Sequence, residues 1–500
     1  MKNLTTLQQF FLSGTAEGDS QFLNRVFVPS EQLAELLSIP AGSPRLLIGN
    51  KGIGKTALLS YLNSIAKKYC VPTLLLAPDD LNYSNLGNNN DIATIKRILY
   101  NSLVHSVSKC IGTQLKGLLS ADEKIIYDTA IAEGLTKPDL ITNLASLLPK
   151  IGAEILKINS NSFAFDLGGN RGGEALALSV KKYLMSSNKL FFLFLDDIDQ
   201  ISSPDSSANL NRIWGLLLAA RKLVQQNIQI RCIISVRTEV WTRLVSDDAG
   251  QRDQVDHFQP LVINLKASDD YIHSIIYKRI KIAAEELGYN AEDPWSCFFS
   301  TKEVTLPKSK ETRKWGNFII KSARQRPRDA IQLVHFLAKT ALSIGHSHIS
   351  DATIESSLVQ YSTGAARYLV GEVGTDCNNF MEVIRSFADL DTFSIPFEKL
   401  KKHLSSMPSR FSLTIRGITL GNDRDNDFFT LLALLHESGF INPRVKDNSM
   451  PRGYNHITFF DDPYLVNRSR LNQLQQTLSW DIHPAFRSFL LDIQKDRFHA

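Results

Sequence analysis

The sequence predicts an α/β protein, built around a central parallel sheet and followed by a largely helical half. The first observation is the run 189–195, which is apolar without alternation, as is typical of a strand buried on both faces of a parallel sheet. The second is the apolar segment 45–48, which leads through a glycine-rich turn into a helix pattern. The third is the alternation of strand and helix patterns across 45–265, which favours a doubly wound core.

The elements of the core follow in chain order. Strands are predicted at 45–48, 72–76, 189–195, 228–236 and 261–265, with helices at 57–62, 91–112, 122–150 and 208–226. The glycines of 167–173 do not follow a strand, so we expect a loop there and not a second glycine-rich phosphate site.

The second half of the chain is predicted to be mainly helical at first and mixed later. Helices are expected at 268–287, 314–343, 351–360 and 428–438. Strand-like pieces at 439–446 and 454–460, joined by 447–453, follow the last helix and are typical of a winged helix. The predicted organisation has an N-terminal segment packing on the core, the core with a helical insertion, a helical lid and a winged-helix-like domain. Their bounds are 1–43, 44–265 (insertion about 81–186), 266–365 and 366–500.

Composition limits the class of protein. The hydrophobic share of 43% and the charged share of 21% are those of a soluble globular chain, which excludes a collagen or a mostly disordered protein. Five scattered cysteines without a CxxC pair indicate thiols. No signal-peptide core or apolar run of about 20 residues is visible, so we expect a cytoplasmic protein with no membrane partner.

The net charge of +5 is concentrated in one segment. Residues 302–329 contain nine basic and three acidic side chains, a net +6, so the rest of the chain nets −1. The basic ones are Lys302, Lys308, Lys310, Arg313, Lys314, Lys321, Arg324, Arg326 and Arg328. Three interpretations stay open: a cluster near bound phosphates and a subunit interface, a nucleic-acid patch, or a solvated loop around Pro307.

The glycine-rich turn carries the strongest motif. Residues 49–56 match G-x-x-x-x-G-K-[ST], the P-loop, in which backbone N–H groups and a helix N-terminus surround phosphates. Its lysine can reach the β- and γ-phosphates of ATP, and its threonine hydroxyl can ligate Mg²⁺. The predicted nucleotide-binding residues are Gly49, Asn50, Lys51, Gly52, Ile53, Gly54, Lys55, Thr56 and Ala57.

Two further strands supply the other candidate catalytic groups. Asp196 and Asp197 end the strand 189–195, so we assign Asp196 to the metal and Asp197 to the attacking water. The alternative for Asp197 is a helix cap or a surface acid. Arg237 ends the strand 228–236, where a charged side chain can sense the γ-phosphate. Its alternative is a salt bridge at the edge of the sheet.

These motifs together resemble the AAA+/STAND group of P-loop ATPases. The segments 14–19 and 325–329 are similar to a bacterial branch of stand-alone ATPases often found beside phage-defence genes. The resemblance implies an α/β ATPase core, a helical lid and a winged-helix module, with Arg326 or Arg328 reaching the nucleotide. Many AAA+ proteins have Glu where this chain has Asp197. The Asp-Asp pair is closer to STAND proteins, in which ATP is often a slow switch for assembly.

Two functions from different classes follow. The first is a Mg-dependent ATPase that uses ATP to control its assembly or a separate effector protein, in antiviral defence. The second is a DNA-binding regulator that acts through the winged helix, with the ATPase core as a switch. The mostly apolar helix 428–438 favours the first. A homo-oligomer is expected by resemblance, with Arg243, Arg252 or Arg279 as candidates to act on a neighbouring subunit.

Overall fold

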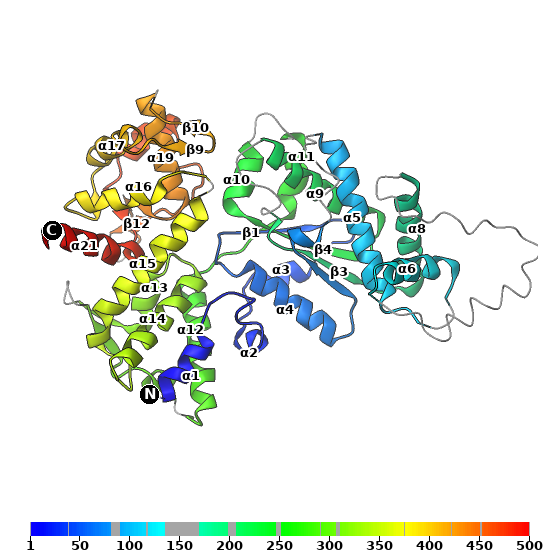
Figure 1. Cartoon of the computed structure of the whole chain (residues 1–500), viewed down its shortest axis with the longest axis horizontal. Helices are drawn as coiled ribbons and strands as arrows, with labels where there is room; N and C mark the ends of the chain where they lie inside the picture. Colours follow the sequence, from blue (N-terminus) through cyan, green and yellow to red (C-terminus); the bar gives the residue numbers. More distant parts are fainter. Residues whose placement is uncertain are drawn as a thin grey trace, which may run out of the picture.

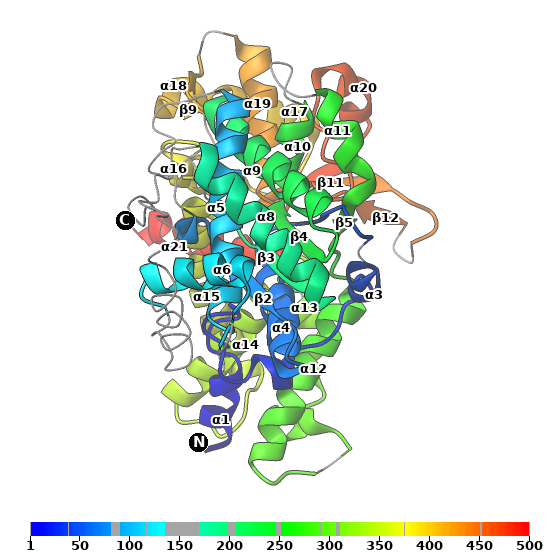
Figure 2. The same ribbon diagram turned by 90° about the vertical axis from the view of Figure 1, so that its right-hand side faces the viewer.

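The computed structural model shows two halves joined along the long axis of the molecule (Figure 1). The residues described are 2–38, 40–81, 91–116, 119–135, 170–198, 207–246, 252–290, 292–306, 311–374, 376–421, 423–450 and 453–499. The α/β core forms one half, and the helical lid and the C-terminal domain form the other, with both termini in that second half. Turned by 90°, the C-terminal domain lies above the lid (Figure 2).

The core contains the predicted parallel sheet. Its strands are ordered β2-β3-β4-β1-β5, and every neighbouring pair is parallel. The strands are β1 (Arg45–Gly49), β2 (Thr73–Leu76), β3 (Phe191–Leu195), β4 (Ile230–Arg237) and β5 (Val262–Asn264). All five lie where the sequence predicts a strand. The acid-bearing strand β3 is not the neighbour of β1, because β4 lies between them.

Helices cover both faces of this sheet. Leu46 and Ile48 of β1 pack with α5 (Ile92–Gly112) and α9 (Ser207–Gln226) in one apolar cluster. Leu47, between them, packs on the other face with α4 (Lys55–Lys68). This alternation explains the unbroken apolar strands, since both faces are buried. Smaller core helices are α2 (Leu23–Val26), α3 (Leu33–Leu37), α10 (Thr238–Ser246) and α11 (Arg252–Phe258).

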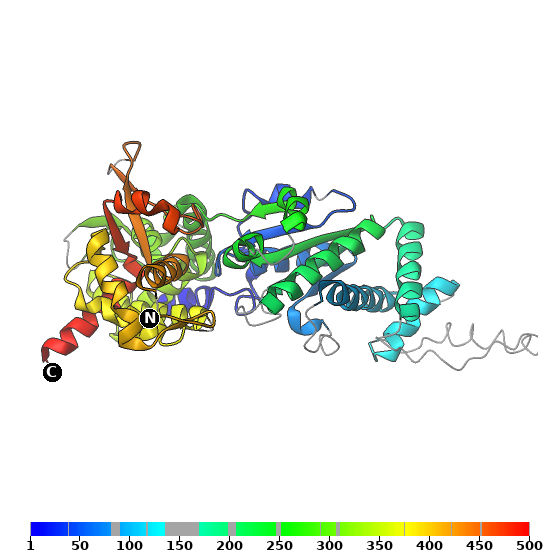
Figure 3. The same ribbon diagram turned by 90° about the horizontal axis from the view of Figure 1, so that it is seen from above.

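The helical insertion lies at the end of the core that is farthest from the lid (Figures 1 and 3). Its described helices beside α5 are α6 (Ala121–Ala132) and α8 (Asn170–Ser187). The prediction of a loop at 167–173 is wrong for residues 170–173, because α8 begins at Asn170. Residues 167–169 lie outside the described residues. The second half of the predicted helix at 122–150 also lies outside them.

The lid is a helical bundle. It contains α12 (Asp269–Glu286), α13 (Trp315–Ser322), α14 (Pro327–Ser343) and α15 (Ile354–Val373), with the short hairpin β6 (Glu303–Thr305) and β7 (Thr312–Lys314). The N-terminal helix α1 (Lys2–Phe10) packs on α12 and α14, through Leu4, Leu7 and Phe10. One helix is predicted over 314–343, but two are present. Gln325 has a positive φ of 51°, and Pro327 begins α14, where its missing N–H costs little.

The C-terminal domain combines short helices with an antiparallel sheet of order β12-β11-β13-β8. The predicted hairpin is present, since β11 (Ile441–Lys446) pairs antiparallel with β12 (Tyr454–His456). The other members are β8 (Ser394–Ile395) and β13 (Ser479–Ile482), which the sequence did not reveal. The remaining elements are α16 (Phe380–Ser386), α17 (Phe397–Ser405), α18 (Met407–Phe411), β9 (Thr414–Ile415), β10 (Ile418–Thr419), α19 (Arg424–Glu437), α20 (Leu471–Gln475) and α21 (Pro484–His499).

Two general expectations can be compared with the structure. The five cysteines are free thiols, as expected. Among the described residues, no helix has the length and apolar character needed to cross a bilayer.

Candidate functional site

The P-loop joins the end of β1 to the start of α4. Gly52 and Gly54 have φ values of 80° and 110°, a region that strongly favours glycine. A Cβ atom on Gly49 would lie 2.9 Å from the Ile53 side chain, so this position also requires glycine. Helix α4 begins without a side-chain cap, which leaves its first N–H groups available to an anion.

Lys55 lies inside this loop. Its side chain is buried, and its Nζ donates to the carbonyl oxygens of Gly49 (2.7 Å) and Asn50 (3.3 Å). A buried ammonium group held by loop carbonyls is placed within the concave side of the loop, where phosphate oxygens would replace or join those acceptors.

The carboxylate of Asp196 lies opposite the first turn of α4. It is buried at the end of β3 and accepts a hydrogen bond from Ser235, and the Thr56 hydroxyl lies near enough to lower its pKa. Burial raises the pKa of Asp196, and the neighbouring Asp197 raises it further, while the two hydroxyl groups and Lys55 lower it. The structure thus brings the predicted metal-binding pair, Thr56 and Asp196, together.

Ser235 is a part of this site that the sequence analysis missed. Its hydroxyl donates to Asp196 Oδ1 at 2.5 Å and accepts from the backbone N–H of Asp197 at 2.9 Å. One side chain of β4 therefore fixes both acids at the end of β3. The available signal was a hydroxyl residue between Ile234 and Val236, in the otherwise apolar end of the predicted strand 228–236.

These residues fit a magnesium ion. Mg²⁺ is commonly held by one or two protein oxygens together with substrate phosphates, and not by a complete protein cage. The pair of Thr56 and Asp196 matches that pattern, and a divalent cation would offset the charge of Asp196 and Asp197, which lie side by side in a buried place. Among the described residues, no group of three or more His, Cys, Asp or Glu side chains forms a complete metal cage.

Asp197 and Arg237 also face the cavity. Asp197 has a φ of 47°, an unusual backbone conformation for a residue other than glycine, of the kind found at functional sites. Arg237 lies at the end of β4, directly beside Gly49 of β1 in the sheet register. Because β4 is an interior strand, Arg237 points out of the middle of the sheet and not from an edge strand.

The lid contributes two more cations. The backbone N–H of Arg328 donates to the carbonyl oxygen of Gly52 at 3.4 Å. A Cβ atom added to Gly52 would lie 3.4 Å from the Cβ of Arg328. Arg326 is buried and pairs with Glu372 of α15 at 2.9 Å. The two lid arginines that the resemblance singles out thus lie against the P-loop. Glu372 was not predicted, because no local pattern links it to a segment 46 residues away.

Five cations meet at this point. Burial lowers the pKa of Lys51, and Arg237, Arg328 and Arg326 lower it further, while Glu372 raises it. With the cations of Lys51, Lys55, Arg237, Arg326 and Arg328 around it, the cavity suits a strongly charged anion.

The cavity has a volume of about 600 Å³ and two chemically different parts. The charged part is described above. The other part is mainly apolar and lies between the N-terminal segment and the lid helices, lined by Leu23, Val26, Phe27, Val28, Tyr271, Ile275 and Ile331. The segment 14–19 reaches the same place, because Gly14 packs against Ile331 and the backbone of Arg328. The two motifs behind the bacterial resemblance are therefore neighbours in space.

The arginines suggested to act on a neighbouring subunit are engaged within the chain. Arg279 is buried and donates to Asp19 at 2.5 Å, so it is not available to another subunit, and this candidate is wrong. Arg243 pairs with Asp376 (2.6 Å) and Glu437 (2.8 Å), which also bind Arg416. The side chain of Arg252 lies outside the described residues.

Several basic residues of the segment 302–328 pair with acids of the same chain. Arg313 pairs with Glu311, Lys321 with Asp269, and Arg324 with Asp329. Lys308 and Lys310 lie outside the described residues. Among the described residues of the segment, Arg326 and Arg328 at its end reach the P-loop.

Comparisons with known proteins give a partial match. A family model described as the FunZ-associated C-terminal helical domain matches residues 270–370, which form the lid. No protein among those with a curated function matches the chain.

Several solved structures share the general arrangement at very low identity. The Walker-type ATPase PABY2304 of Pyrococcus abyssi is 12% identical with a TM-score of 0.41, over 93% of this chain and 96% of that one. The Aeropyrum pernix ORC2 protein is 10% identical with a TM-score of 0.36, over 97% and 95%. AMPPCP-bound DnaA from Aquifex aeolicus is 13% identical with a TM-score of 0.32, over 82% of this chain and 89% of that one. Likeness at this level says nothing about ligand or activity.

Proposed function

We propose that this chain is a Mg-dependent ATPase whose nucleotide lies between the core and the lid. The observation that carries the proposal is the meeting of the Thr56 hydroxyl with the Asp196 carboxylate, beside a P-loop lysine and four further cations. A triphosphate needs cationic side chains and free N–H groups, and its metal needs hard oxygen ligands. One cavity offers both.

The charged part of the cavity suits the phosphates, and the apolar part suits the base. The phosphates lie at the N-terminus of α4, against Gly52, Gly54 and Lys55, and the base lies in the apolar part beside Tyr271 and Ile331. Mg²⁺, held by Thr56 and Asp196, would neutralise charge on the phosphate oxygens. A volume of about 600 Å³ is within the usual range of about 300–1,000 Å³ for small-molecule sites.

Asp197 is the proposed group for the attacking water. Its amide is fixed by Ser235, which orients the carboxylate toward the cavity while Asp196 remains beside Thr56. A second carboxylate next to the metal-binding one fits transfer of the phosphoryl group to water. Arg237 and the lid arginines Arg326 and Arg328 would stabilise charge on the γ-phosphate.

The nucleotide cavity also adjoins the ion pairs between the core and the C-terminal domain. Arg243 of the core, Asp376, and Glu437 of α19 line it and form the ion-pair network that joins the core to the C-terminal domain. We therefore infer a nucleotide-controlled switch that changes assembly or the contact with an effector protein. Cytoplasmic location, oligomer formation and a role in antiviral defence belong to the same proposal and rest on the sequence resemblance.

The DNA-binding alternative has less support. Helix α19 carries Asp425 and Asp427 in its first turn, and its apolar residues, including Leu431 and Leu435, are buried in the domain core. A helix that reads the major groove presents basic and polar groups to the DNA. Binding of duplex DNA by the full chain with a steep salt dependence would revive this function.

ATP binding and hydrolysis test the proposal. The full chain, the Lys55→Ala variant and the Asp197→Asn variant are compared with and without Mg²⁺. We expect Mg-dependent phosphate release from the wild type, weakened ATP binding at the P-loop with little hydrolysis by Lys55→Ala, and binding without hydrolysis by Asp197→Asn. A wild-type chain that neither binds nor hydrolyses ATP would overturn the proposal.

A further inference from the structure

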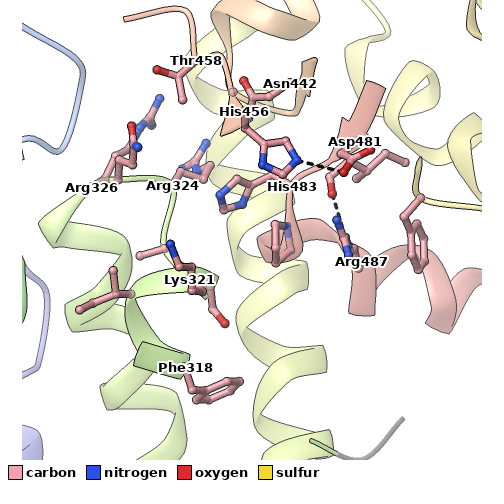
Figure 4. Close-up of a pocket in the computed structure, with 18 of the residues that line it drawn as sticks. Phe318, Lys321, Arg324, Arg326, Asn442, His456, Thr458, Asp481, His483 and Arg487 are labelled. Atoms are coloured by element: carbon pink, nitrogen blue, oxygen red, sulfur yellow. Dashed lines mark hydrogen bonds and ion pairs between the residues drawn. The ribbon is translucent and has the colours of Figure 1, made fainter. Parts of the chain in front are cut away.

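A second cavity lies between the lid and the C-terminal domain (Figure 4). The residues of α13 and the segment 323–326 form one side of it, and β11, β12, β13 and the start of α21 form the other. Its volume is about 1180 Å³, close to twice that of the nucleotide cavity. The proposed ATPase reaction makes no use of this space, which is large enough for a small-molecule ligand.

The rim of this second cavity carries balanced charges. Three surface ion pairs lie there: Arg313 with Glu311 (2.5 Å), Lys321 with Asp269 (3.1 Å) and Lys495 with Glu355 (3.3 Å). Each cation already has an acidic partner, and Asp492 also lines the cavity, so the rim does not itself attract an anion.

The inner wall has an excess of positive charge. Asp481 faces two arginines: Arg444 lies 3.8 Å from its carboxylate, and the field of Asp481 acts on Arg487. The same carboxylate also binds His456 at 2.9 Å, while the Nε of Arg487 donates to the Ile482 carbonyl at 2.8 Å. Two guanidinium groups therefore share one carboxylate, and the wall would be stabilised by an added anion.

The position and the pKa of His483 agree with a positive inner wall. Figure 4 shows it between Arg324 and the group formed by Asp481 and Arg487. The pKa of His483 is lowered to about 3, mainly by burial, with Arg324 and Arg487 adding to the effect and Asp329 opposing it. His483 is therefore neutral, in keeping with a positive environment.

Aromatic rings fix both arginines in place. The guanidinium of Arg487 lies 5.6 Å from the centre of the Phe393 ring, and that of Arg444 lies 5.0 Å from the Tyr454 ring. A guanidinium stacked in this way keeps its planar donors in one orientation, which suits the oxygens of a phosphate or carboxylate. The same rings, with Phe459, give the wall flat apolar faces.

Two buried polar atoms of the wall have no hydrogen-bond partner within the described part of the chain. They are Oδ1 of Asn442, a residue only 7% exposed, and Nε of Arg444. Buried polar groups are nearly always hydrogen-bonded, because an unsatisfied one costs about 1–3 kcal/mol. Both residues line the cavity with other atoms, and a small shift of their side chains on ligand binding would bring the unpaired atoms to the ligand.

We propose that this second cavity binds a nucleoside phosphate, with its phosphate on Arg444 and Arg487 and its base among the flat side chains of Tyr454 and Phe459. The positive inner wall selects the phosphate, the aromatic faces select a planar apolar body, and the amide of Asn442 offers a polar contact to the base or sugar. The size of the cavity accommodates all three parts together.

This site borders the P-loop cavity directly. Asn50, Arg326 and Glu437 line both cavities, and the segment 324–326 separates them. A ligand in the second cavity would therefore change the affinity of the first, and the effect is reciprocal by linkage. This coupling rests on the proposed ATPase site, whereas binding in the second cavity does not.

The test counts nucleotide sites by equilibrium binding on full chains, with ATP, AMP and inorganic triphosphate as probes. We expect two ATP molecules per wild-type chain, one in Lys55→Ala, and one in Arg487→Gln, whose second site is weakened at least 10-fold. Lys495→Ala, a rim lysine already paired, serves as the control and should retain both. In Lys55→Ala, AMP should bind more tightly than inorganic triphosphate, because only AMP carries a base.

The readouts separate the two proposals. If Lys55→Ala binds no ATP or AMP up to millimolar concentration, the second site does not exist, whatever the P-loop does. If Lys55→Ala binds one nucleotide but the wild type shows no second, Lys55-dependent site, the proposed ATPase site fails and this one stands. Tight binding of triphosphate with no preference for AMP would reduce the cavity to a general anion site and overturn the proposal.

A second measurement covers the case in which Arg487→Gln folds poorly. Hydrogen exchange is followed in the Lys55→Ala chain with and without AMP. We expect slower exchange at 441–446, 454–456 and 479–487. Unchanged exchange there in the presence of saturating AMP would contradict binding in this cavity.

Discussion

The two sides of the nucleotide cavity are built in different ways. On the core side, Asp196 and Ser235 lie at the ends of strands β3 and β4, and Lys55 begins α4 after β1, all at the carboxyl end of a single buried sheet. On the lid side, Arg326 belongs to the helical bundle of the lid, and one ion pair with Glu372 of α15 holds its side chain. In the proposed ATPase, the core side would therefore fix the reaction geometry, and the lid side would set how strongly the two halves of the molecule respond to the nucleotide.

The largest effect is expected at Asp197, the group assigned to the attacking water. Asp197→Asn keeps nearly the same size and removes the charge, so hydrolysis should fall by about 10²–10⁴-fold, the usual range for a lost general base. ATP affinity should change little. Single-turnover phosphate release and ATP binding measure the two effects, with the exposed Asp270→Asn as the control. Equal loss of binding and hydrolysis would contradict the role of Asp197.

The second effect is expected at Lys55. Lys55→Ala removes a buried, charge-assisted contact to the phosphates, so ATP binding at the P-loop should weaken by about 100-fold, equivalent to about 2.7 kcal/mol. Isothermal titration with ATP and Mg²⁺ measures this change in affinity. Both proteins also carry Arg487→Gln, which weakens the second cavity, so that the P-loop site dominates the binding. The exposed Lys68→Ala, on the same helix, should behave like its parent. A similar loss in both variants would show a general charge effect instead.

A smaller effect is expected at Ser235. Ser235→Ala leaves the Asp197 amide and one Asp196 oxygen without their shared partner, so hydrolysis should fall by about 10-fold, equivalent to about 1.4 kcal/mol. More Mg²⁺ should be needed for half-maximal hydrolysis. Titration of the rate with Mg²⁺ measures both, beside the exposed control Ser274→Ala. An unchanged rate and Mg²⁺ requirement would mean that Ser235 only packs.

The smallest effect has the opposite sign and lies on the lid side. Glu372→Gln removes the negative charge beside Arg326 and Arg324, so the cavity becomes more positive and ATP should bind about 3- to 10-fold more tightly. The control is the exposed Glu398→Gln, and the measurement is again titration calorimetry in the Arg487→Gln background. Weaker ATP binding by Glu372→Gln would mean that the acid is needed to position Arg326.

The same contrast explains what could be predicted from the sequence. The core strands and the P-loop, Asp196 and Arg237 were found because contiguous apolar runs end in these residues, and parallel strands end at one edge. Ser235 was missed because its role depends on which strand neighbours β3. Glu372 and the strands β8 and β13 were missed because their partners are distant in sequence, and no local pattern records such pairing.

The Arg279 error has the same origin. Its partner Asp19 lies 260 residues away, so the sequence alone could not show that the arginine is already paired. Conversely, Arg326 and Arg328 came from the family resemblance, and their position against Gly52 depends on the docking of the lid. Motifs of neighbouring residues could be recognised in the sequence, whereas contacts between distant segments and between domains could not.

Phosphate release from ATP tests the central claim most directly. The wild-type chain and Lys55→Ala are incubated with ATP, with and without Mg²⁺, and the phosphate released is measured over time. We predict release by the wild type only when Mg²⁺ is present, and little release by Lys55→Ala under either condition. Equal release by the two proteins, or release by the wild type that does not depend on Mg²⁺, would contradict an ATPase site built from the P-loop, Thr56 and Asp196.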